Sequence, residues 1–211
     1  MEGPADRAAL AALLGPLLES GRARGVGVHF LPQHGKDAVL AEVPNRAAHH
    51  LADRPGDLVI ALPDLYPMAR YAGTSNAHSS FEELEALLRS RFDARADKLG
   101  LASEVRTRFR VHCLKHDLEV LLLAASEELR QRLGTEDQLQ RAWRRPVEEQ
   151  NDVRPPKRVV EELFRKYRKK PGYVETTDAP WILGRADLRA VMTACPQRFG
   201  PFVEDLRAAV G

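Results

Sequence analysis

The strongest structural signal in the sequence is the run DLVIALP at residues 57–63, which is short and almost continuously apolar. Runs of this kind are typical of central strands in parallel sheets, because helices cover such strands on both faces. A second strand is predicted for RTRFRVHCL at 106–114, and a helical pattern follows each of the two runs. Strands that alternate with helices predict an α/β fold with a parallel or mostly parallel sheet flanked by helices.

Other elements are predicted from periodicity and capping signals. Leucines at three- and four-residue steps predict a helix over 4–21. A serine followed by early glutamates is a helix start, and it predicts a helix over 79–92. Further segments are predicted as strands at 25–31 and 37–43 and as helices at 44–52 and 116–133.

The composition changes near residue 135, where Gln, Arg and Glu begin to dominate. We therefore expect two domains, an α/β domain over residues 1–134 and a helical C-terminal extension over 135–211 that packs on it. Two prolines at the end of a turn favour a helix start after them. The helices predicted in the extension span 136–145, 155–170, 185–194 and 201–209.

Composition narrows the class of protein without selecting a ligand. The chain of 211 residues has a formal net charge of +2 with 29% charged residues, so no field of a single sign points to nucleic acid. Cys113 and Cys195 are far apart in apolar surroundings, which is typical of a reduced protein and not of a disulfide scaffold. The sequence has neither a signal-peptide pattern nor an apolar stretch of about 18 residues, so we expect a cytoplasmic protein without a membrane span.

Carboxylates stand at the predicted strand ends. Asp64 directly follows the first predicted strand, and Asp117 and Glu119 follow the second. Because ligands bind outside the carboxyl ends of parallel strands, we expect these acids to meet at one edge of the sheet. Together with Glu2 they predict a site for Mg²⁺ or Mn²⁺, since hard divalent cations take carboxylate, water and phosphate oxygens. Glu2, Asp64 and Glu119 are the predicted catalytic residues, because a metal there would stabilise a scissile phosphate and activate water.

Each of these acids also has a simpler interpretation. Glu2 is a charge near a helix start, where the macrodipole favours an acid, and Asp64 precedes a proline-containing loop and would then cap a turn. Asp117 and Glu119 are two residues apart, so they do not share a helix face. We expect Glu119 to point to the site, because it lies nearer the leucine run and its burial would require a partner. His116 is interpreted as a neighbour of the helix N-cap, with a general-acid role as the alternative.

Cations that would hold a phosphate backbone occur in two places. One follows a glycine in GKD at residues 35–37, and the others gather in the C-terminal segment. Clustered cations attract phosphates by counterion release, and Tyr167 offers a ring on which a base stacks. The alternative is a helix C-terminus, where the macrodipole favours cations in any case. The predicted nucleic-acid-binding residues are Lys36, Lys157, Arg158, Arg165, Lys166, Tyr167, Lys169 and Lys170.

Four segments resemble motifs that occur in the same order in a known family. They are EGPADRAALAALLGPLL at 2–18, VIALPDLYP at 59–67, FRVHCLKHDLEVLLL at 109–123 and EEQNDVRPPKRVVEELFRKYRKKPG at 148–172. On these segments the chain resembles a TOPRIM-related, DUF4276-like family over nearly its whole length. The residues that match the family's motif positions are Glu2, Asp64, Asp117, Glu119, Asn151, Lys157 and Arg158.

The resemblance implies a TOPRIM-like sheet whose acids hold magnesium for nucleic-acid strand chemistry. It also implies an ABC-type ATPase as partner, encoded nearby in bacterial anti-phage defence loci. The chain departs from the family pattern in several places. The family has an apolar strand before its first glutamate, so we expect that strand to be missing or encoded upstream of Met1. Tyr66 stands where a TOPRIM protein has its third carboxylate, Asp117 replaces a glutamate, and Asp6 replaces or shifts the acid after the glycine.

Two functional hypotheses follow. The first is a metal-dependent nuclease, or an effector derived from one, that cleaves phosphodiester bonds of DNA or RNA together with an ATPase. It requires Glu2, Asp64 and Glu119 to converge on one cation. The second is a non-catalytic scaffold that binds and regulates an ATPase or nucleic acid, which the missing first strand and the absent third carboxylate favour. Both hypotheses leave the oligomeric state open.

Overall fold

The computed structural model describes residues 1–139, 143–150, 154–168 and 170–211. The chain forms two compact units, the first from residues 1–3 and 32–114 and the second from residues 4–31 and 115–211. This division differs from the predicted domains, since the boundary expected after residue 134 falls inside the second unit. Over the described parts of the chain, no helix combines the length and the apolar composition that a bilayer span requires.

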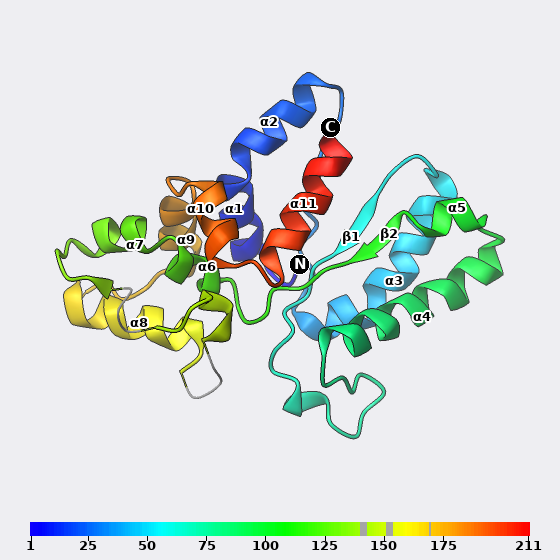
Figure 1. Cartoon of the computed structure of the whole chain (residues 1–211). Helices are drawn as coiled ribbons and strands as arrows, with labels where there is room; N and C mark the ends of the chain where they lie inside the picture. Colours follow the sequence, from blue (N-terminus) through cyan, green and yellow to red (C-terminus); the bar gives the residue numbers. More distant parts are fainter. Residues whose placement is uncertain (140–142, 151–153, 169) are drawn as a thin grey trace. The chain divides into compact units, whose positions relative to one another are not determined.

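The first unit contains two short parallel strands, β1 (Val59–Ala61) and β2 (Phe109–Val111), which pair directly with each other (Figure 1). The pairing continues beyond the strand ends as an isolated parallel bridge between Asp64 and Leu114. Both strands lie within the runs predicted from sequence, and their parallel orientation is as predicted. Within the described residues the sheet has these two strands only, so the fold is mixed α/β and rich in helices.

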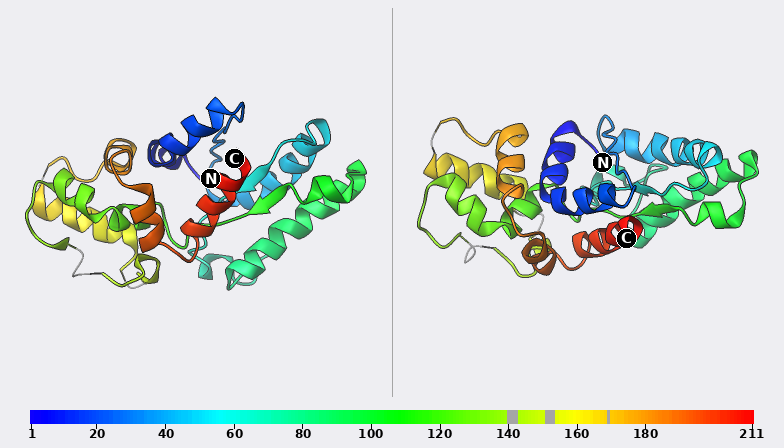
Figure 2. Two further views of the ribbon diagram at one scale, coloured as in Figure 1. Left: turned by 45° about the horizontal axis from the view of Figure 1, so that its top comes forward. Right: turned by 90° about the horizontal axis from the view of Figure 1, so that it is seen from above.

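The helices of the first unit are α3 (Lys36–Asp53), η1 (Ala69–Tyr71), α4 (Phe81–Leu99) and α5 (Ser103–Arg106). The helices α3 and α4 pack against each other, α3 against β1 and α4 against β2, and Figures 1 and 2 show both helices running beside the strands. The two helices and the strands share one core, which includes the stacked rings of Phe92 and Phe109.

Local sequence signals account for both ends of α4. The Ser80 hydroxyl accepts a hydrogen bond from the Glu83 backbone N–H at 3.2 Å, which satisfies one of the free donors of the first turn. At the other end Gly100 adopts φ 66°, a left-handed conformation that glycine takes without a Cβ penalty. The helix therefore begins where it was predicted and extends one to two turns further.

Two strand predictions in this part of the chain are wrong. Residues 37–43 belong to α3, which continues through Pro44. The segment's apolar residues Val39 and Leu40 are both buried, together with residues one and two turns later, so they form a helix face. Residues 25–31 alternate between exposed and half-buried positions as a strand would, but within the described residues they pair with no strand.

The second unit is helical in its described residues. Its elements are α1 (Pro4–Leu13), α2 (Gly15–Ala23), α6 (Glu119–Ala124), α7 (Ser126–Leu133), η3 (Val147–Glu149), α8 (Pro156–Tyr167), α9 (Glu175–Leu183), α10 (Leu188–Ala194) and α11 (Phe199–Val210). α1 packs on α9, α2 on α11, and α6 on α8, α9 and α10. The helix predicted at 4–21 is divided at Leu14, and the one at 116–133 is divided at Ala125.

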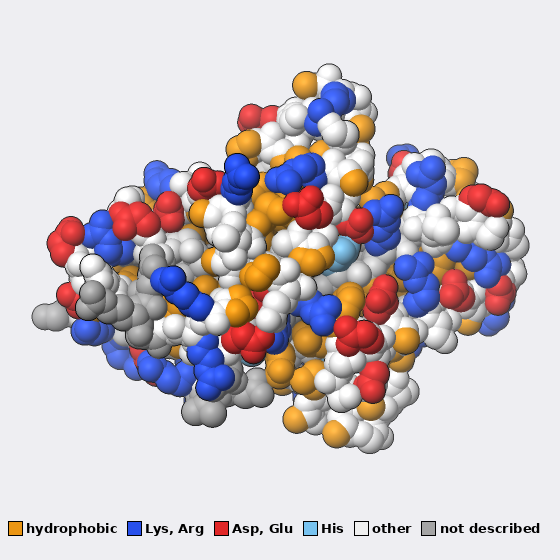
Figure 3. All heavy atoms as spheres, in the orientation of Figure 1, with side chains coloured by type: hydrophobic (Ala, Val, Ile, Leu, Met, Phe, Trp, Pro, Cys, Tyr) orange, Lys and Arg blue, Asp and Glu red, His pale blue; other side chains and the backbone are white. Residues whose placement is uncertain are grey.

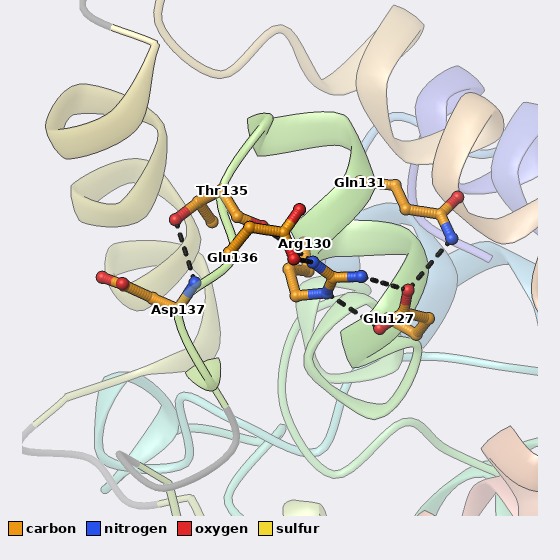
Figure 4. A network of polar contacts seen from close by, with 6 residues as sticks. All are labelled: Glu127, Arg130, Gln131, Thr135, Glu136 and Asp137. Carbon is orange, nitrogen blue, oxygen red and sulfur yellow. Dashed lines mark hydrogen bonds and ion pairs between the residues drawn. The ribbon is translucent and has the colours of Figure 1, made fainter.

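Of the helix predicted at 136–145, residues 136–138 and 143–145 are not helical, Leu139 has a 3₁₀ conformation, and residues 140–142 lie outside the described residues. A side chain competes with the helix there, because the Thr135 hydroxyl accepts the backbone N–H of Asp137 at 3.2 Å. Arg130 also binds the end of α7 to this turn, donating to the Thr135 carbonyl and to the carboxylates of Glu127 and Glu136 (Figure 4). The guanidinium of Arg130 lowers the pKa of Glu127 to about 2.

A buried carboxylate fastens the start of α11. Glu148 is 1% exposed and accepts three backbone hydrogen bonds, from Gln197 at 2.6 Å, Arg198 at 2.8 Å and Phe199 at 3.0 Å. One side chain thereby binds the N–H groups of the first helical residue, of the N-cap and of the residue before the cap. These three hydrogen bonds compensate the carboxylate of Glu148 for its loss of water, so its burial requires no ligand.

Asp178 has a similar structural role in α9. It is 2% exposed, and its carboxylate accepts from the guanidinium of Arg132 at 2.6 Å, from that of Arg168 at 3.2 Å and from the Val174 backbone N–H at 2.7 Å. The carboxylate therefore joins α7, α9 and the end of α8, with its charge compensated by two cations.

These contacts predict that Glu148→Gln destabilises the protein. The amide would turn an N–H group toward backbone N–H donors, so we expect the free energy of unfolding to fall by about 1–3 kcal/mol. Urea unfolding measures the change. The control is Glu204→Gln, also at α11 but with a 63% exposed side chain, which should change stability by less than about 0.5 kcal/mol. Equal effects of the two substitutions would contradict the role of Glu148.

Candidate functional site

The structure places the four predicted metal-binding acids in two pairs, one pair in each unit. Glu2 and Asp64 belong to the first unit, and Asp117 and Glu119 belong to the second. The two pairs differ in their surroundings, and each is described by itself.

In the first unit, the N-terminal segment brings Glu2 to the end of β1. The backbone N–H groups of Gln33 and Gly35 donate to the carbonyls of Met1 and Glu2 at 3.1 and 3.0 Å, so residues 1–3 run beside the segment that leads into α3. The carboxylate of Glu2 accepts a hydrogen bond from the backbone N–H of Asp64 at 3.0 Å. The Asp64 backbone and the Glu2 carboxylate therefore lie together beyond the carboxyl ends of β1 and β2. Strand order predicts Asp64 beside Asp117 and Glu119, and this stays a prediction because those two acids belong to the second unit.

A buried lysine accompanies this pair of acids. Lys36 is 5% exposed, and its Nζ donates to the Leu65 carbonyl at 2.7 Å and lies 3.2 Å from Nε2 of His78. Burial lowers the pKa of Lys36, whereas the negative charges of Glu2 and Asp64 raise it. The acids at the strand ends thus face an ammonium group that has little contact with water.

Next to Lys36, a small polar network ties η1 to α3. The Tyr71 hydroxyl donates to Asp37 at 2.8 Å, and Arg70 forms an ion pair with the same carboxylate at 2.5 Å. Burial and the hydrogen bond to Asp37 raise the pKa of Tyr71 to about 12. The Tyr71 ring lies 4.9 Å from the Lys36 Nζ, within the range of a cation–π contact.

The second pair of acids lies at the start of α6. Glu119 is 1% exposed, and its Oε1 is 3.9 Å from the Nζ of Lys157, which donates to Glu175 at 2.8 Å. Three buried polar atoms in this cluster have no hydrogen-bond partner among the described residues: Asp117 Oδ1, Glu119 Oε1 and the Tyr173 hydroxyl. Unsatisfied buried polar atoms are rare in native proteins, so these three require an explanation.

Burial also changes the acidity of these groups. It raises the pKa of Asp117 to about 6, against the opposing charge of Lys157. It raises the pKa of Glu119 to about 7, with a further contribution from the charge of Asp117. Burial and the neighbouring carboxylate of Glu119 raise the pKa of Tyr173 well above its usual range. Strongly shifted groups of this kind are concentrated at functional sites.

The buried acids of the second unit differ in how many of their hydrogen bonds are made. Glu148 and Asp178 are as buried as Glu119, but each accepts at least three hydrogen bonds. Glu119 and Asp117 each keep an oxygen without a partner. Packing explains the first two acids and leaves the second two unexplained, which makes Asp117 and Glu119 candidates for binding or chemistry.

Sequence reasoning missed three residues of these clusters. His78 lies in a loop without a recognisable pattern. Tyr173 and Glu175 stand at the start of α9, a helix that is not predicted from the sequence because it contains Pro180. The partners of these residues come from distant segments, so no local signal identifies them.

The basic residues predicted to hold nucleic acid have diverse surroundings. Lys36 is buried in the first unit, and Lys157 belongs to the acid cluster of the second. Arg158 and Arg165 are exposed on α8 and Lys170 is exposed beyond it. Figure 3 shows Lys and Arg side chains gathered in the region of α8, interspersed with acids elsewhere on the same face.

Tyr167, the residue predicted to stack on a base, already contacts two side chains of the protein. The Tyr167 hydroxyl binds the carboxylate of Asp137, and the Nζ of Lys166 lies over the Tyr167 ring at 4.4 Å from its centre. A base would have to displace Lys166 in order to stack there. Two residues of the sequence analysis, Asn151 and Lys169, lie outside the described residues.

The described residues hold carboxylates in pairs and not in larger metal-binding sets. Among them, no three His, Cys, Asp or Glu side chains are grouped so that they could hold a metal ion. Mg²⁺ commonly takes one or two protein carboxylates and keeps several waters, so a site at Glu2 and Asp64 stays a prediction. The convergence of Glu119 on Glu2 and Asp64 would involve both units, and it stays a prediction.

Comparison with known proteins gives one match. A family model with the description "Domain of unknown function (DUF4276)" matches residues 1–207. No curated protein and no solved structure matches the chain. The match covers all four segments on which the resemblance was based.

The raised pKa of Glu119 predicts that this residue lowers stability at neutral pH. A folded-state pKa of about 7 against an ordinary 4.5 means that the folded state binds the proton more tightly, so the free energy of unfolding falls as the pH rises through this interval. Glu119→Gln should therefore be more stable than the parent by about 1–3 kcal/mol at pH 8 and no more stable at pH 4. Urea unfolding at both pH values measures this difference, and a loss of stability at pH 8 would contradict it.

Proposed function

The chain belongs to the DUF4276 family. We propose that it is a TOPRIM-like, Mg²⁺- or Mn²⁺-dependent nuclease or a nuclease-derived effector. Its substrate would be a phosphodiester bond of DNA or RNA. Its partner would be an ABC-type ATPase in anti-phage defence, as the resemblance implies. The observation that carries the proposal is the hydrogen bond between the Glu2 carboxylate and the Asp64 backbone beyond the ends of two parallel strands.

Glu2 and Asp64 would hold the metal. When bound, the metal would supply positive charge to the scissile phosphate and lower the pKa of a water. The hydrogen bond from Asp64 fixes the Glu2 carboxylate, so this side chain needs little reorganisation to hold a ligand. The exposed cations Arg158 and Arg165 would contact the phosphate backbone.

A second candidate is a non-catalytic TOPRIM-like scaffold that binds and regulates an ATPase or nucleic acid. It is favoured by the buried ammonium of Lys36, which already places a positive charge near Glu2 and Asp64. It is also favoured because no three metal-binding side chains are grouped together among the described residues. A scaffold of this kind would keep the family's fold and bind its partner without cleaving a phosphodiester.

The proposal predicts that cleavage depends on Asp64. The parent protein should cleave plasmid DNA or a long RNA in the presence of Mg²⁺ or Mn²⁺, alone or with the neighbouring ATPase. Asp64→Asn and Glu2→Gln should each reduce the rate by about 100-fold or more, because each removes a metal ligand. Gel electrophoresis of the nucleic acid measures the rate.

The control is Glu42→Gln in the same unit. Glu42 forms an exposed ion pair with Arg46, so this variant should cleave at the rate of the parent. Intact DNA and RNA in every mixture would contradict the nuclease and favour the scaffold. Cleavage that survives both Asp64→Asn and Glu2→Gln would come from a contaminant or from another site.

A further inference from the structure

We propose that the first unit contains an oxyanion site in which Lys36, oriented by His78, binds a phosphate group. The inference deepens the proposed function, because it names the side chain that would hold the substrate's phosphate, and it rests on that function for the choice of phosphate as ligand. Lys36 would be a binding residue, and His78 a positioning residue that acts through it.

The first argument is the state of the Lys36 ammonium. A buried cation is ordinarily paired with a carboxylate, since removing it from water is otherwise unfavourable. Lys36 is 5% exposed, yet its two hydrogen-bonding contacts are a carbonyl and an imidazole nitrogen, both neutral acceptors. It forms no ion pair with any described carboxylate. An ammonium has three donors, so these two acceptors leave one. The Tyr71 ring, 4.9 Å from the Nζ, is a weak cation–π partner for it, and a phosphate oxygen would bind it more strongly.

The second argument is the way in which His78 holds this ammonium. His78 is 6% exposed, and its Nδ1 lies 2.7 Å from the carbonyl of Asn76. Because a carbonyl only accepts, Nδ1 donates to it. Nε2 lies 3.2 Å from the Lys36 Nζ and 3.3 Å from the Leu65 carbonyl, which itself accepts from the same ammonium at 2.7 Å. Since an ammonium only donates, Nε2 accepts from Lys36. Two fixed acceptors therefore set the direction of the remaining donor.

The third argument is the backbone from which Lys36 projects. Lys36 is the first residue of α3, an 18-residue helix whose N-cap is Gly35, and no side chain caps it. A helix N-terminus attracts anions through its free N–H groups and its dipole. Gly35 has φ 86°, and a Cβ built on it would meet no atom within 4 Å, while its N–H donates to the Glu2 carbonyl at 3.0 Å.

The charges around the ammonium set the strength of this site. The carboxylates of Glu2 and Asp64 and the guanidinium of Arg70 all act on Lys36, and Arg70 is itself paired with Asp37. The two carboxylates oppose an anion, although the hydrogen bond from the Asp64 backbone stabilises the charge of Glu2. We therefore expect weak phosphate binding in isolation, which depends on Lys36 and strengthens at a site where Glu2 and Asp64 bind a cation.

Calorimetry with inorganic pyrophosphate in the presence of EDTA tests the site in the full chain. The parent should bind pyrophosphate, and Lys36→Met should bind it about tenfold more weakly or not at all, because the charge and the free donor are gone. Lys36→Arg should retain more affinity than Lys36→Met. The matched control is Lys98→Met, at an exposed lysine of the same unit, which should bind as the parent does.

Two His78 variants separate positioning from folding. Glutamine offers a carbonyl oxygen to the Lys36 ammonium, so His78→Gln should keep most of the affinity, whereas His78→Leu should lose it. A purely structural role would lower the melting temperature in both variants without this difference in affinity. The His78 pair also provides the test if Lys36→Met does not fold.

The inference is overturned if the parent does not bind pyrophosphate, or if Lys36→Met binds it as the parent does. The measurement needs neither a metal nor turnover, so it is independent of the cleavage assay. Pyrophosphate binding that depends on Lys36, without any cleavage, would contradict the nuclease function and support the oxyanion site. Cleavage together with pyrophosphate binding that does not depend on Lys36 would support the nuclease function and contradict the oxyanion site.

Discussion

A charge that leaves water must find partners inside the protein, and this constraint divides the buried ionisable groups of the chain into two sets. Glu148 and Asp178 have all the donors that their carboxylates need. They join helices and hold α11 and α9 in place. Glu119 and Lys36 are equally removed from water but keep an acceptor or a donor unused. The incomplete set is where binding or chemistry is to be sought.

The strand pair of the first unit gives Glu2 and Asp64, beside Lys36, their position. β1 and β2 run in parallel, so the residues that follow them emerge at the same edge, and the Asp64–Leu114 bridge extends the pairing to this point. The N-terminal residues reach the same edge through backbone bonds to the segment before α3, which brings Glu2 to Asp64. The apolar run at 57–63 forms β1, and its pairing with β2 places Asp64 beside Glu2 and near the buried Lys36.

Much of this arrangement could be predicted from sequence, for physical reasons. The run at 57–63 is too short and too apolar for an exposed element, and the Ser80 cap with its glutamates is sufficient to start α4. The rule that ligands bind at strand ends predicts Asp64 beside Asp117 and Glu119, which belong to the second unit, whereas the contact of Asp64 with Glu2 comes from the N-terminal segment. The segment at 37–43 was misassigned because a few apolar residues fit either period, and only packing beneath Val39 and Leu40 decides between them. His78 and Tyr173 gain their importance from partners far along the chain, which no local pattern reveals.

The most direct test of the central claim is the binding of Mn²⁺ to the full chain, followed by electron paramagnetic resonance of the free ion. If Glu2 and Asp64 form the metal site, the parent binds Mn²⁺, Asp64→Ala and Glu2→Gln both release it, and Glu148→Gln, which alters a carboxylate engaged only in structure, retains it. Equal Mn²⁺ binding by the parent and by both of the first two variants, or no binding by the parent, would contradict a metal site at the ends of β1 and β2.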